Sequence, residues 1–251
     1  MAKTKIFSYY KYKLANVYRK LTRPFFQFEI ELDNISNIFS CSLSRKGWHP
    51  IVETLKEYDQ NAHIDVRDTT LWKYHKNFCP TGIESFFKLD EFKLPLFVYP
   101  WGTFSNGDIS TNKVSLSSRF CGPSSDDFIK QEFKRIIDLY QKLQKTGYKP
   151  TKFPNSFISG TILERRDGSK KLIVMQGNHR AAIFAHLGKK NIKFRLGSDA
   201  LKYVREIESK SWPLVNKKLC SNYNALKIFN YFYNENGNHI KSLIEKNDSK
   251  E

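Results

Sequence analysis

The sequence has no long apolar run. Its longest hydrophobic stretches, such as residues 94–101, have the length of a strand and are interrupted by proline. A helix that spans a bilayer needs about 20 predominantly apolar residues. The basic amino-terminal region also lacks the continuous apolar segment and the small-residue cleavage site of a secretory signal. We therefore expect a cytoplasmic protein, either free or bound peripherally at the inner membrane surface.

Closely spaced cysteines are missing as well. Cys41, Cys79, Cys121 and Cys220 lie far apart, and no pair has the CxxC spacing of a zinc ribbon or a thioredoxin-type site. Free cysteines usually behave as small buried hydrophobic residues. We expect four reduced structural thiols and no metal ion bound by cysteine.

Acidic residues are too few to balance the basic ones, and the net charge is +17. Such a charge permits binding to nucleic acid or to an anionic membrane. However, the 42 basic residues comprise 31 lysines and 11 arginines, whereas bidentate recognition of phosphate or guanine favours arginine. An AT-rich genome would produce the same lysine bias, so the charge alone does not indicate nucleic acid.

The chain is long and hydrophobic enough to bury a sizeable core, with 251 residues of which 40% are hydrophobic. The pattern predicts an α/β (α+β) fold in which a small mixed sheet is covered by helices. We divide the chain into five parts. These are a basic amphipathic helix (residues 1–25), an irregular α/β extension (26–118), a core (119–200), a helical segment (201–245) and a frayed charged tail (246–251).

Residues 1–25 contain seven basic residues and no acidic residue, and their apolar residues have helical spacing. Pro24 ends the predicted helix. Two alternatives remain: residues 1–23 lie on an anionic membrane surface, or the apolar stripe packs on the protein's own core. The stripe consists of Ile6, Tyr10, Leu14, Val17 and Leu21.

The region 26–118 gives weaker signals. Runs of apolar and aromatic residues predict strands at 26–32 and 94–99, and helical spacing predicts a short helix at 50–58. The stretch 72–80 mixes aromatic and polar residues without a clear period, and we interpret it as a loop that covers the surface. Residues 101–107 contain two glycines and also predict a loop.

A long amphipathic helix is predicted from about Ser125 to Gly147, with an apolar stripe that begins at Ile129. Ser124 and Asp127 have the spacing of a capping box, and Asp126 and Asp127 suit the positive end of the helix dipole. A second amphipathic helix is predicted at 222–235.

An Asp167-Gly168 turn between strands at 158–164 and 171–175 predicts a hairpin. The second strand runs directly into Gln176-Gly-Asn-His-Arg180, followed by a short helix that ends before Gly188 and by a strand at 192–195. Strand, turn, helix and strand in this order predict an α/β crossover unit.

The turn has the chemistry of a phosphate site. Gly177 allows a sharp turn and a close approach of the backbone to a ligand, and the first helical amides point outward without internal partners. Asn178 is a suitable N-cap. His179 adds a donor that can switch its charge, and Arg180 adds a permanent planar cation.

The segment 174–188, Val-Met-Gln-Gly-Asn-His-Arg-Ala-Ala-Ile-Phe-Ala-His-Leu-Gly, resembles the signature of the ParB/sulfiredoxin superfamily. The usual signature is a strand, Asp-Gly-x-His-Arg, a short helix ending in Leu-Gly, and a further strand. The resemblance covers residues 158–195. Members of this superfamily include partition proteins that bind CTP, ATP-dependent sulfiredoxins, and kinases that phosphorylate free serine.

The resemblance implies that Gly177, Asn178, His179 and Arg180 contact nucleotide phosphates, with ATP or CTP and Mg²⁺ as cofactors. Two positions depart from the pattern. Gln176 stands where many members have an acid, and Asn178 stands where sulfiredoxins have their nucleophilic cysteine, so reduction of sulfinic acid is not expected. No helix-turn-helix follows the motif as it does in partition proteins, which disfavours sequence-specific DNA binding.

Further candidates surround this turn. Arg119 and Ser124 precede a helix and form a second candidate anion site, although simple capping is the alternative. Transfer of a phosphoryl group to a hydroxyl needs a nearby base, and four carboxylates are close in sequence: Asp126, Asp127, Glu132 and Glu164. We expect His186 to face packing or solvent.

We therefore predict a nucleotide-dependent phosphotransferase that acts on a small hydroxyl-bearing substrate, with catalysis supplied mainly by positioning. The alternative is a non-catalytic nucleotide switch of the partition-protein type, or a nucleic-acid-binding protein. A third interpretation is a peripheral membrane protein whose superfamily domain serves only as a scaffold.

Overall fold

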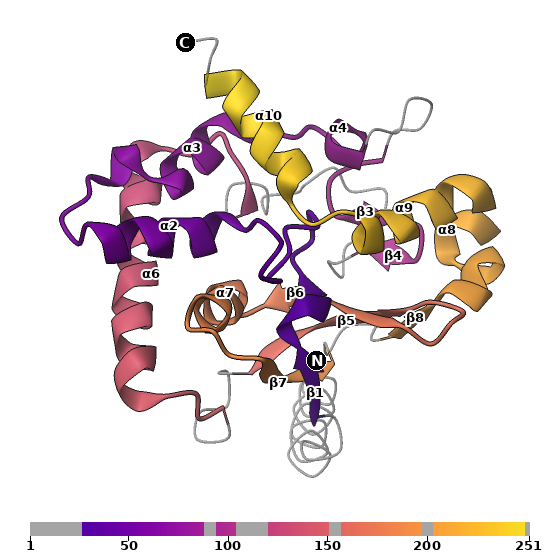
Figure 1. Cartoon of the computed structure of the whole chain (residues 1–251). Helices are drawn as coiled ribbons and strands as arrows, with labels where there is room; N and C mark the ends of the chain where they lie inside the picture. Colours follow the sequence, from indigo (N-terminus) through magenta and orange to yellow (C-terminus); the bar gives the residue numbers. More distant parts are fainter. Residues whose placement is uncertain (1–26, 88–93, 104–119, 151–156, 197–202, 249–251) are drawn as a thin grey trace, which may run out of the picture.

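The computed structural model describes residues 27–87, 94–103, 120–150, 157–196 and 203–248 (Figure 1). The predicted helix at residues 1–25 and Arg119 lie outside these ranges. The described chain forms a mixed six-stranded sheet covered by helices, which confirms the predicted α/β (α+β) class. The strands of the sheet are β1 (Gln27–Glu31), β2 (Ile35–Ser36), β5 (Ile158–Glu164), β6 (Lys170–Gln176), β7 (Asn191–Leu196) and β8 (Tyr203–Arg205).

The order of the sheet is β1-β7-β5-β6-β2, and β8 also pairs with β5. β7 and β8 run parallel to β5 along successive parts of the same edge, whereas β6 pairs with β5 antiparallel on the other edge. β1 and β2 place residues 27–36 in the same sheet as the hairpin. A separate two-stranded sheet consists of β3 (Val98–Tyr99) and β4 (Gly102–Thr103).

Two hydrophobic clusters lie against the sheet. In β6, Leu172 and Val174 belong to one cluster and Ile173 to the other, because successive side chains of a strand point to opposite faces. The first cluster includes α2 (Pro50–Gln60), α6 (Asp126–Thr146) and α7 (Asn178–His186).

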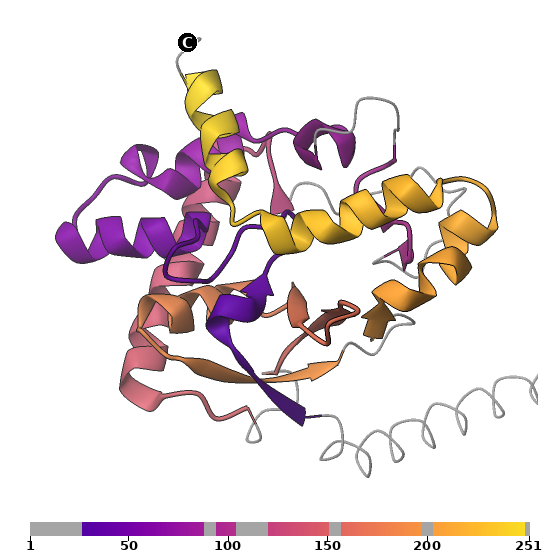
Figure 2. The same cartoon turned by 45° about the vertical axis from the view of Figure 1, so that its right-hand side comes forward.

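The second cluster includes residues of five helices and of β3. Figures 1 and 2 show α6, α2 and α7 on one side of the molecule and α8 and α9 on the other. The helices of this cluster are α3 (Thr70–Asn77), α4 (Glu84–Phe87), α8 (Pro213–Asn216), α9 (Asn222–Asn234) and α10 (Asn238–Asp248).

Four predicted features are confirmed. The hairpin is β5–β6, the helix predicted at 50–58 is α2, the helix predicted at 222–235 is α9, and the long helix predicted to end at Gly147 is α6. Gly147 and Gly168 have φ values of 66° and 82°, as a helix end and a tight turn require. The predicted capping residue of α6 was wrong. Ser125 is the N-cap, and its hydroxyl accepts a hydrogen bond from the amide of Phe128 at 3.3 Å.

Other predictions were wrong in ways that packing explains. The stretch 72–80 is not a surface loop, because most of it belongs to α3, whose Tyr74 and His75 are buried. Only Val98–Tyr99 of the predicted strand 94–99 is extended. The tail is helical as far as Asp248, and the Asn247 side chain donates to the carbonyl of Asn77 at 2.9 Å.

The strand that follows α7 does not pair with the strand that precedes it, as it would in the simplest crossover unit. α7 follows β6, but the next strand, β7, pairs parallel with β5 and lies on the far side of it from β6. The parallel crossover therefore joins β5 to β7, and β6 is an antiparallel insertion within it. This arrangement puts the Gln176–Arg180 turn beside the amino-terminal end of β5, where Ser159 pairs with Gln176.

The connection between α9 and α10 packs tightly on the loop that precedes α2. The carbonyl of Asn236 accepts hydrogen bonds from the amides of Ser42 and Trp48 at 3.4 and 2.8 Å. Gly237, with φ of 97°, lies against the Trp48 carbonyl so closely that a Cβ atom would overlap it. These contacts join segments that are nearly 200 residues apart, since Asn236 also bonds to Lys46, 190 positions away.

Candidate functional site

The turn between β6 and α7 has the backbone geometry of an anion site. Gly177 is the N-cap of α7 with φ of 86°, and Asn178, which we expected to be the cap, is the first helical residue. The first bond within the helix runs from the amide of Ala181 to the carbonyl of Gly177 at 3.0 Å. The amides of Asn178 and His179 therefore have no partner within the helix, and they lie at the positive end of its dipole.

A side chain at position 177 would be crowded as well as strained by the left-handed φ value. A Cβ atom at this position would lie 3.1 Å from Nη2 of Arg180 and 3.2 Å from Cα of Ile158. The Arg180 guanidinium thus folds back beside the turn. Burial lowers the pKa of Arg180 below its ordinary value, against the opposing effect of the Tyr148 phenol. A bound anion would offset this loss of hydration.

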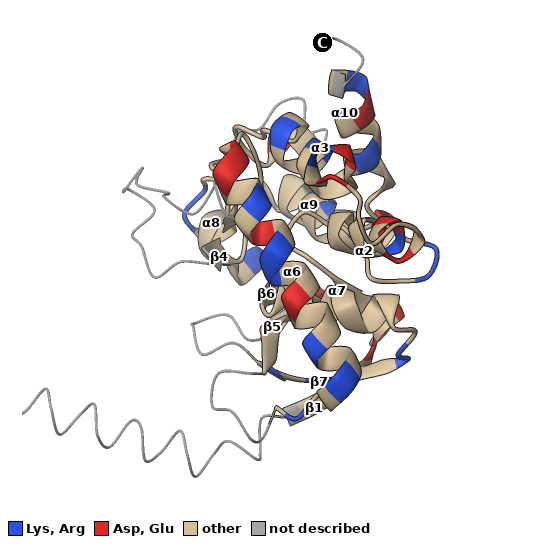
Figure 3. Ribbon diagram, turned by 90° about the vertical axis from the view of Figure 1, so that its left-hand side faces the viewer, with Lys and Arg blue, Asp and Glu red and all other residues tan. Residues whose placement is uncertain are grey.

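The turn opens into a cleft with a volume of about 1360 Å³. α6 forms one wall, with Glu132 and Arg135, and α3 forms another, with Tyr74 and His75. Figure 3 shows α6 in the foreground, with basic and acidic residues interspersed along it. Three helices that lie far apart in the sequence, α3, α6 and α7, therefore contribute to the cleft.

His179 and Glu132 form a close polar contact in the cleft. Nε2 of His179 lies 2.6 Å from Oε1 of Glu132, and both side chains are largely buried, at 20% and 11% exposure. Burial alone would raise the Glu132 pKa, but the hydrogen bond and charge of His179, with smaller effects of Arg135 and His75, lower it below its usual value. Glu132 is therefore an ionised partner of His179 at neutral pH.

Two further histidines lie beside this pair. Burial lowers the pKa of His49 to about 3 and that of His75 to about 4, and His179 adds to both shifts. Nδ1 of His49 accepts the amide of Ile51 at the start of α2, and Nδ1 of His75 lies 3.1 Å from the Ser124 hydroxyl. Neither histidine was predicted from the sequence as part of the site, although a polar residue directly before Pro50 is a helix-start signal that applies to His49.

The other three candidate carboxylates do not reach the turn. Asp126 pairs with Lys76 at 2.6 Å, Asp127 is exposed, and neither lines the cleft. Glu164 lies at the opposite end of β5 from the residue that pairs with Gln176, about 17 Å away at the rise of a strand. Of the four carboxylates, the structure brings Glu132 to the turn.

Ser124 belongs to the support of the cleft. Its hydroxyl and its amide both bond to His75, at 3.1 Å each, and the residue is buried. It therefore does not present its hydroxyl outward as the second anion site would require. We expected His186 to face packing or solvent. It also has a polar partner, because its Nε2 lies 2.7 Å from Oδ2 of Asp59.

Within the described ranges, no group of three or more His, Cys, Asp and Glu side chains is arranged to hold a metal ion. Likewise, none of the helices in the described part of the chain has the length and apolar character to cross a membrane. Comparisons of the chain with protein-family models, with curated proteins and with solved structures find no match.

Proposed function

We propose that the chain is a nucleotide-dependent phosphotransferase that binds phosphates at the Gln176–Arg180 turn. The observation that carries the proposal is the turn itself: a left-handed Gly177 at the start of α7, with Arg180 beside it and the His179–Glu132 pair on its first helical turn. Helix amides and a guanidinium are groups that recognise a phosphate.

The pair also provides a base for the hydroxyl-bearing substrate. With Nε2–H donating to Glu132, the other ring nitrogen of His179, Nδ1, can accept a proton. In the proposed step, the substrate oxygen attacks the terminal phosphorus while its proton passes to His179. The bond from phosphorus to the bridging oxygen breaks, and the nucleoside diphosphate leaves. Glu132 orients the ring and stabilises the imidazolium that forms.

The residues at the turn do not fit a metal ion held by the protein. Glu132 is the carboxylate of the cleft nearest the turn, and it already bonds to His179 and lies 3.4 Å from Nη1 of Arg135. Mg²⁺ in phosphoryl-transfer sites is usually held by one or two carboxylates together with the substrate phosphates. We assign no step to Mg²⁺, and the chain's own cations, Arg180 and Arg135, are the groups that would balance phosphate charge.

The test is transfer of label from γ-³²P-ATP or γ-³²P-CTP to a pool of small hydroxyl-bearing metabolites. His179→Gln should lower the rate by about a hundredfold or more, the range for loss of a general base. Asp127→Asn is the matched control, because Asp127 is exposed and lies outside the cleft. It should retain full activity.

Two outcomes would contradict the proposal. Tight nucleotide binding without transfer to any metabolite would favour the non-catalytic switch. Equal rates for His179→Gln and the parent protein would remove His179 from the reaction, and Glu132→Gln would then decide whether the carboxylate acts alone.

A further inference from the structure

A second groove adjoins the phosphate cleft. Its volume is about 700 Å³, and it shares Leu143, Gly147, Tyr148 and Lys149 with the cleft. The two hollows therefore adjoin at the carboxyl-terminal end of α6. A ligand anchored at the Gln176–Arg180 turn would reach this groove past the Tyr148 side chain, which lines both hollows.

The groove follows one face of α7. Arg180 lines the cleft, and Phe184 and Leu187 line the groove. Their spacing of four and then three residues places all three on one side of the helix. The distance from Arg180 to Leu187 along the helix is about 10 Å, a span that a ribose and one or two phosphates can bridge.

The floor of the groove is apolar and partly aromatic. Ile192 and Phe184 are buried beneath it, and the Tyr148 and Phe184 rings lie with centroids 5.0 Å apart. The Tyr148 hydroxyl bonds to the backbone of Ile158 and Lys193, at 3.1 and 3.3 Å, which fixes this ring between the groove and the turn. An apolar, partly aromatic floor suits a planar ring, which can pack on the face of one of these side chains.

The rim of the groove is rich in hydrogen-bond donors. Three lysines can only donate, and two amides can donate and accept, whereas a single carboxylate, Glu29, can only accept. Glu29 lies opposite Lys193 in the pairing of β1 with β7. The donors are Lys149, Lys189 and Lys193, with the amides of Gln144 and Asn191.

We infer that this groove binds the base of the nucleotide whose phosphates lie on the turn, and that it prefers a base with a ring carbonyl oxygen to adenine. Lysine and amide donors pair with such an oxygen, whereas adenine presents an amino group at the corresponding edge. The inference rests on the proposed function for its anchor and adds the position and the chemical class of the base.

Isothermal titration with pyrophosphate, ADP, GDP and CDP tests the inference on the full chain. GDP and CDP should bind at least about tenfold more tightly than pyrophosphate or ADP, a factor that one good hydrogen-bonding pair supplies. Leu187→Arg, which fills the groove, should weaken GDP by about tenfold and leave pyrophosphate unchanged.

Lys193→Ala gives a milder version of the same test, because this lysine is exposed and its loss does not endanger folding. It should weaken GDP and leave pyrophosphate unchanged. Lys190→Ala is the matched control, since Lys190 is an equally exposed lysine that does not line the groove. Its affinities should equal those of the parent protein.

The outcomes separate the two proposals. If pyrophosphate fails to bind and Arg180→Ala changes nothing, the phosphate site is wrong. If pyrophosphate binds but both groove variants bind GDP as the parent protein does, the phosphate site stands and the base site is wrong. If octyl phosphate binds as tightly as GDP, the groove accepts any apolar group, and recognition of a base is wrong.

Discussion

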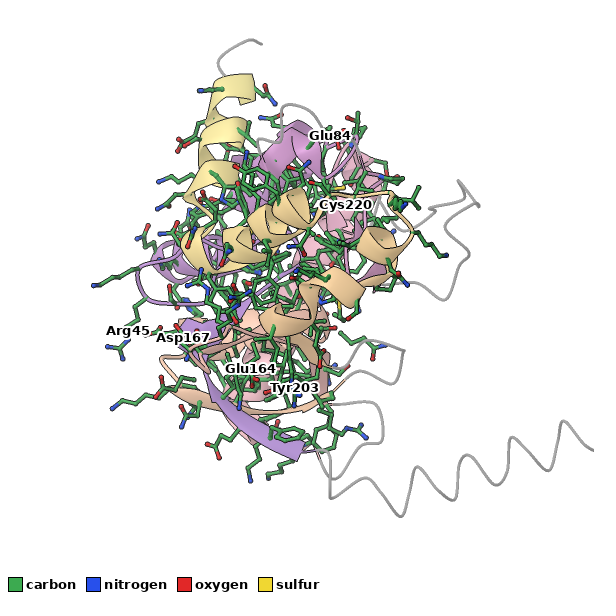
Figure 4. All side chains as sticks on the ribbon, turned by 90° about the vertical axis from the view of Figure 1, so that its right-hand side faces the viewer. Arg45, Glu84, Glu164, Asp167, Tyr203 and Cys220 are labelled. Carbon is green, nitrogen blue, oxygen red and sulfur yellow. The ribbon has the colours of Figure 1, made fainter. Side chains whose placement is uncertain are left out.

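The two ends of the β5–β6 hairpin carry similar charged residues in different surroundings. At one end, His179, Glu132 and Arg180 meet in the cleft beside Gly177. At the other end, Glu164 accepts a hydrogen bond from Tyr203 and lies 3.5 Å from Lys170 and 3.8 Å from Arg205. Figure 4 shows Glu164 and Tyr203 next to each other at this far end.

The difference lies in hydration. The partners of Glu164, Lys170 and Arg205, are 51% exposed each, whereas His179, the partner of Glu132, is 20% exposed. The two carboxylates differ less, with Glu164 22% and Glu132 11% exposed. Exposed ion pairs contribute about 0–1 kcal/mol because water screens them. Buried charges interact strongly, but they need partners or a ligand. Burial within a concave surface, and not the number of charges, therefore distinguishes the candidate site from the charged cluster.

The largest expected effect concerns acid. His49 and His75 have pKa values lowered by burial to about 3 and about 4, from an ordinary value of 6.5. Below pH 6.5 the unfolded chain therefore binds protons that the folded chain does not. The free energy of unfolding should fall as the pH drops from 6.5 toward 4, by about 1 kcal/mol or more per pH unit for each histidine.

Urea unfolding at a series of pH values measures this slope. His75→Gln should flatten it. The range from pH 6.5 to 4.5 is the informative one, because the Glu132 carboxylate, whose pKa is lowered, remains ionised there in the folded protein. A stability that stays constant over this range would mean that the cleft is as well hydrated as the far end of the hairpin.

Two glycines allow a direct comparison of the hairpin ends. Gly177 and Gly168 both have left-handed φ, but a side chain at Gly168 would meet nothing within 4 Å. Both Gly→Val changes should destabilise the fold by roughly 1–3 kcal/mol through backbone strain. Gly177→Val should add the cost of crowding Ile158 and should abolish nucleotide binding. Binding that survives in Gly177→Val would refute the backbone approach to phosphate.

Two arginines provide the next comparison. Arg180→Ala should weaken nucleotide binding by about ten- to a hundredfold, the loss of 1.5–3 kcal/mol from a charge-assisted hydrogen bond. Arg180→Lys should recover only part, because an ammonium lacks the planar fork. Arg205→Ala, in the exposed cluster, should bind as the parent protein does. Titration calorimetry on folded variants gives these affinities, and equal losses at both positions would remove the distinction between the two ends.

The smallest effect is expected at the start of α6, the helix that supplies Glu132. Ser125→Ala removes the observed cap and should lower stability by about 1 kcal/mol, with unchanged nucleotide affinity. Thermal unfolding with and without nucleotide measures both quantities. Ser124→Ala instead removes the hydrogen bond to His75 inside the support of the cleft. Identical behaviour of the two serine variants would show that this support does not matter for the site.

Local chemistry made part of this structure predictable. Asp167-Gly168 and Gly147 require backbone angles that their neighbours in sequence already suggest, and the apolar stripe from Ile129 has a clear helical period. The turn at Gly177 was predictable for the same reason, since strand, glycine and helix follow one another without interruption.

The remainder depends on contacts between distant segments. Glu132 meets His179 across 47 positions, and among four carboxylates nothing in the sequence distinguished it. α3 was missed because His75 and Tyr74 are polar or aromatic residues buried by tertiary contacts, to Ser124 and to the carbonyl of Phe120. The pairing of β1 with β7 likewise joins strands that have no local signal for each other.

The close fit of Gly237 against the Trp48 carbonyl has a consequence for the order of folding. Contacts such as those from Asn236 to Lys46 and Trp48 close a loop of about 190 residues. The entropy of closing a loop must be lost before its contacts can compensate, and folding slows as the mean sequence separation of contacts grows. The β5–β6 hairpin, whose contacts are local, can form early. The second hydrophobic cluster, which needs α9 and α10 against residues 38–48, should form in the last and slowest step.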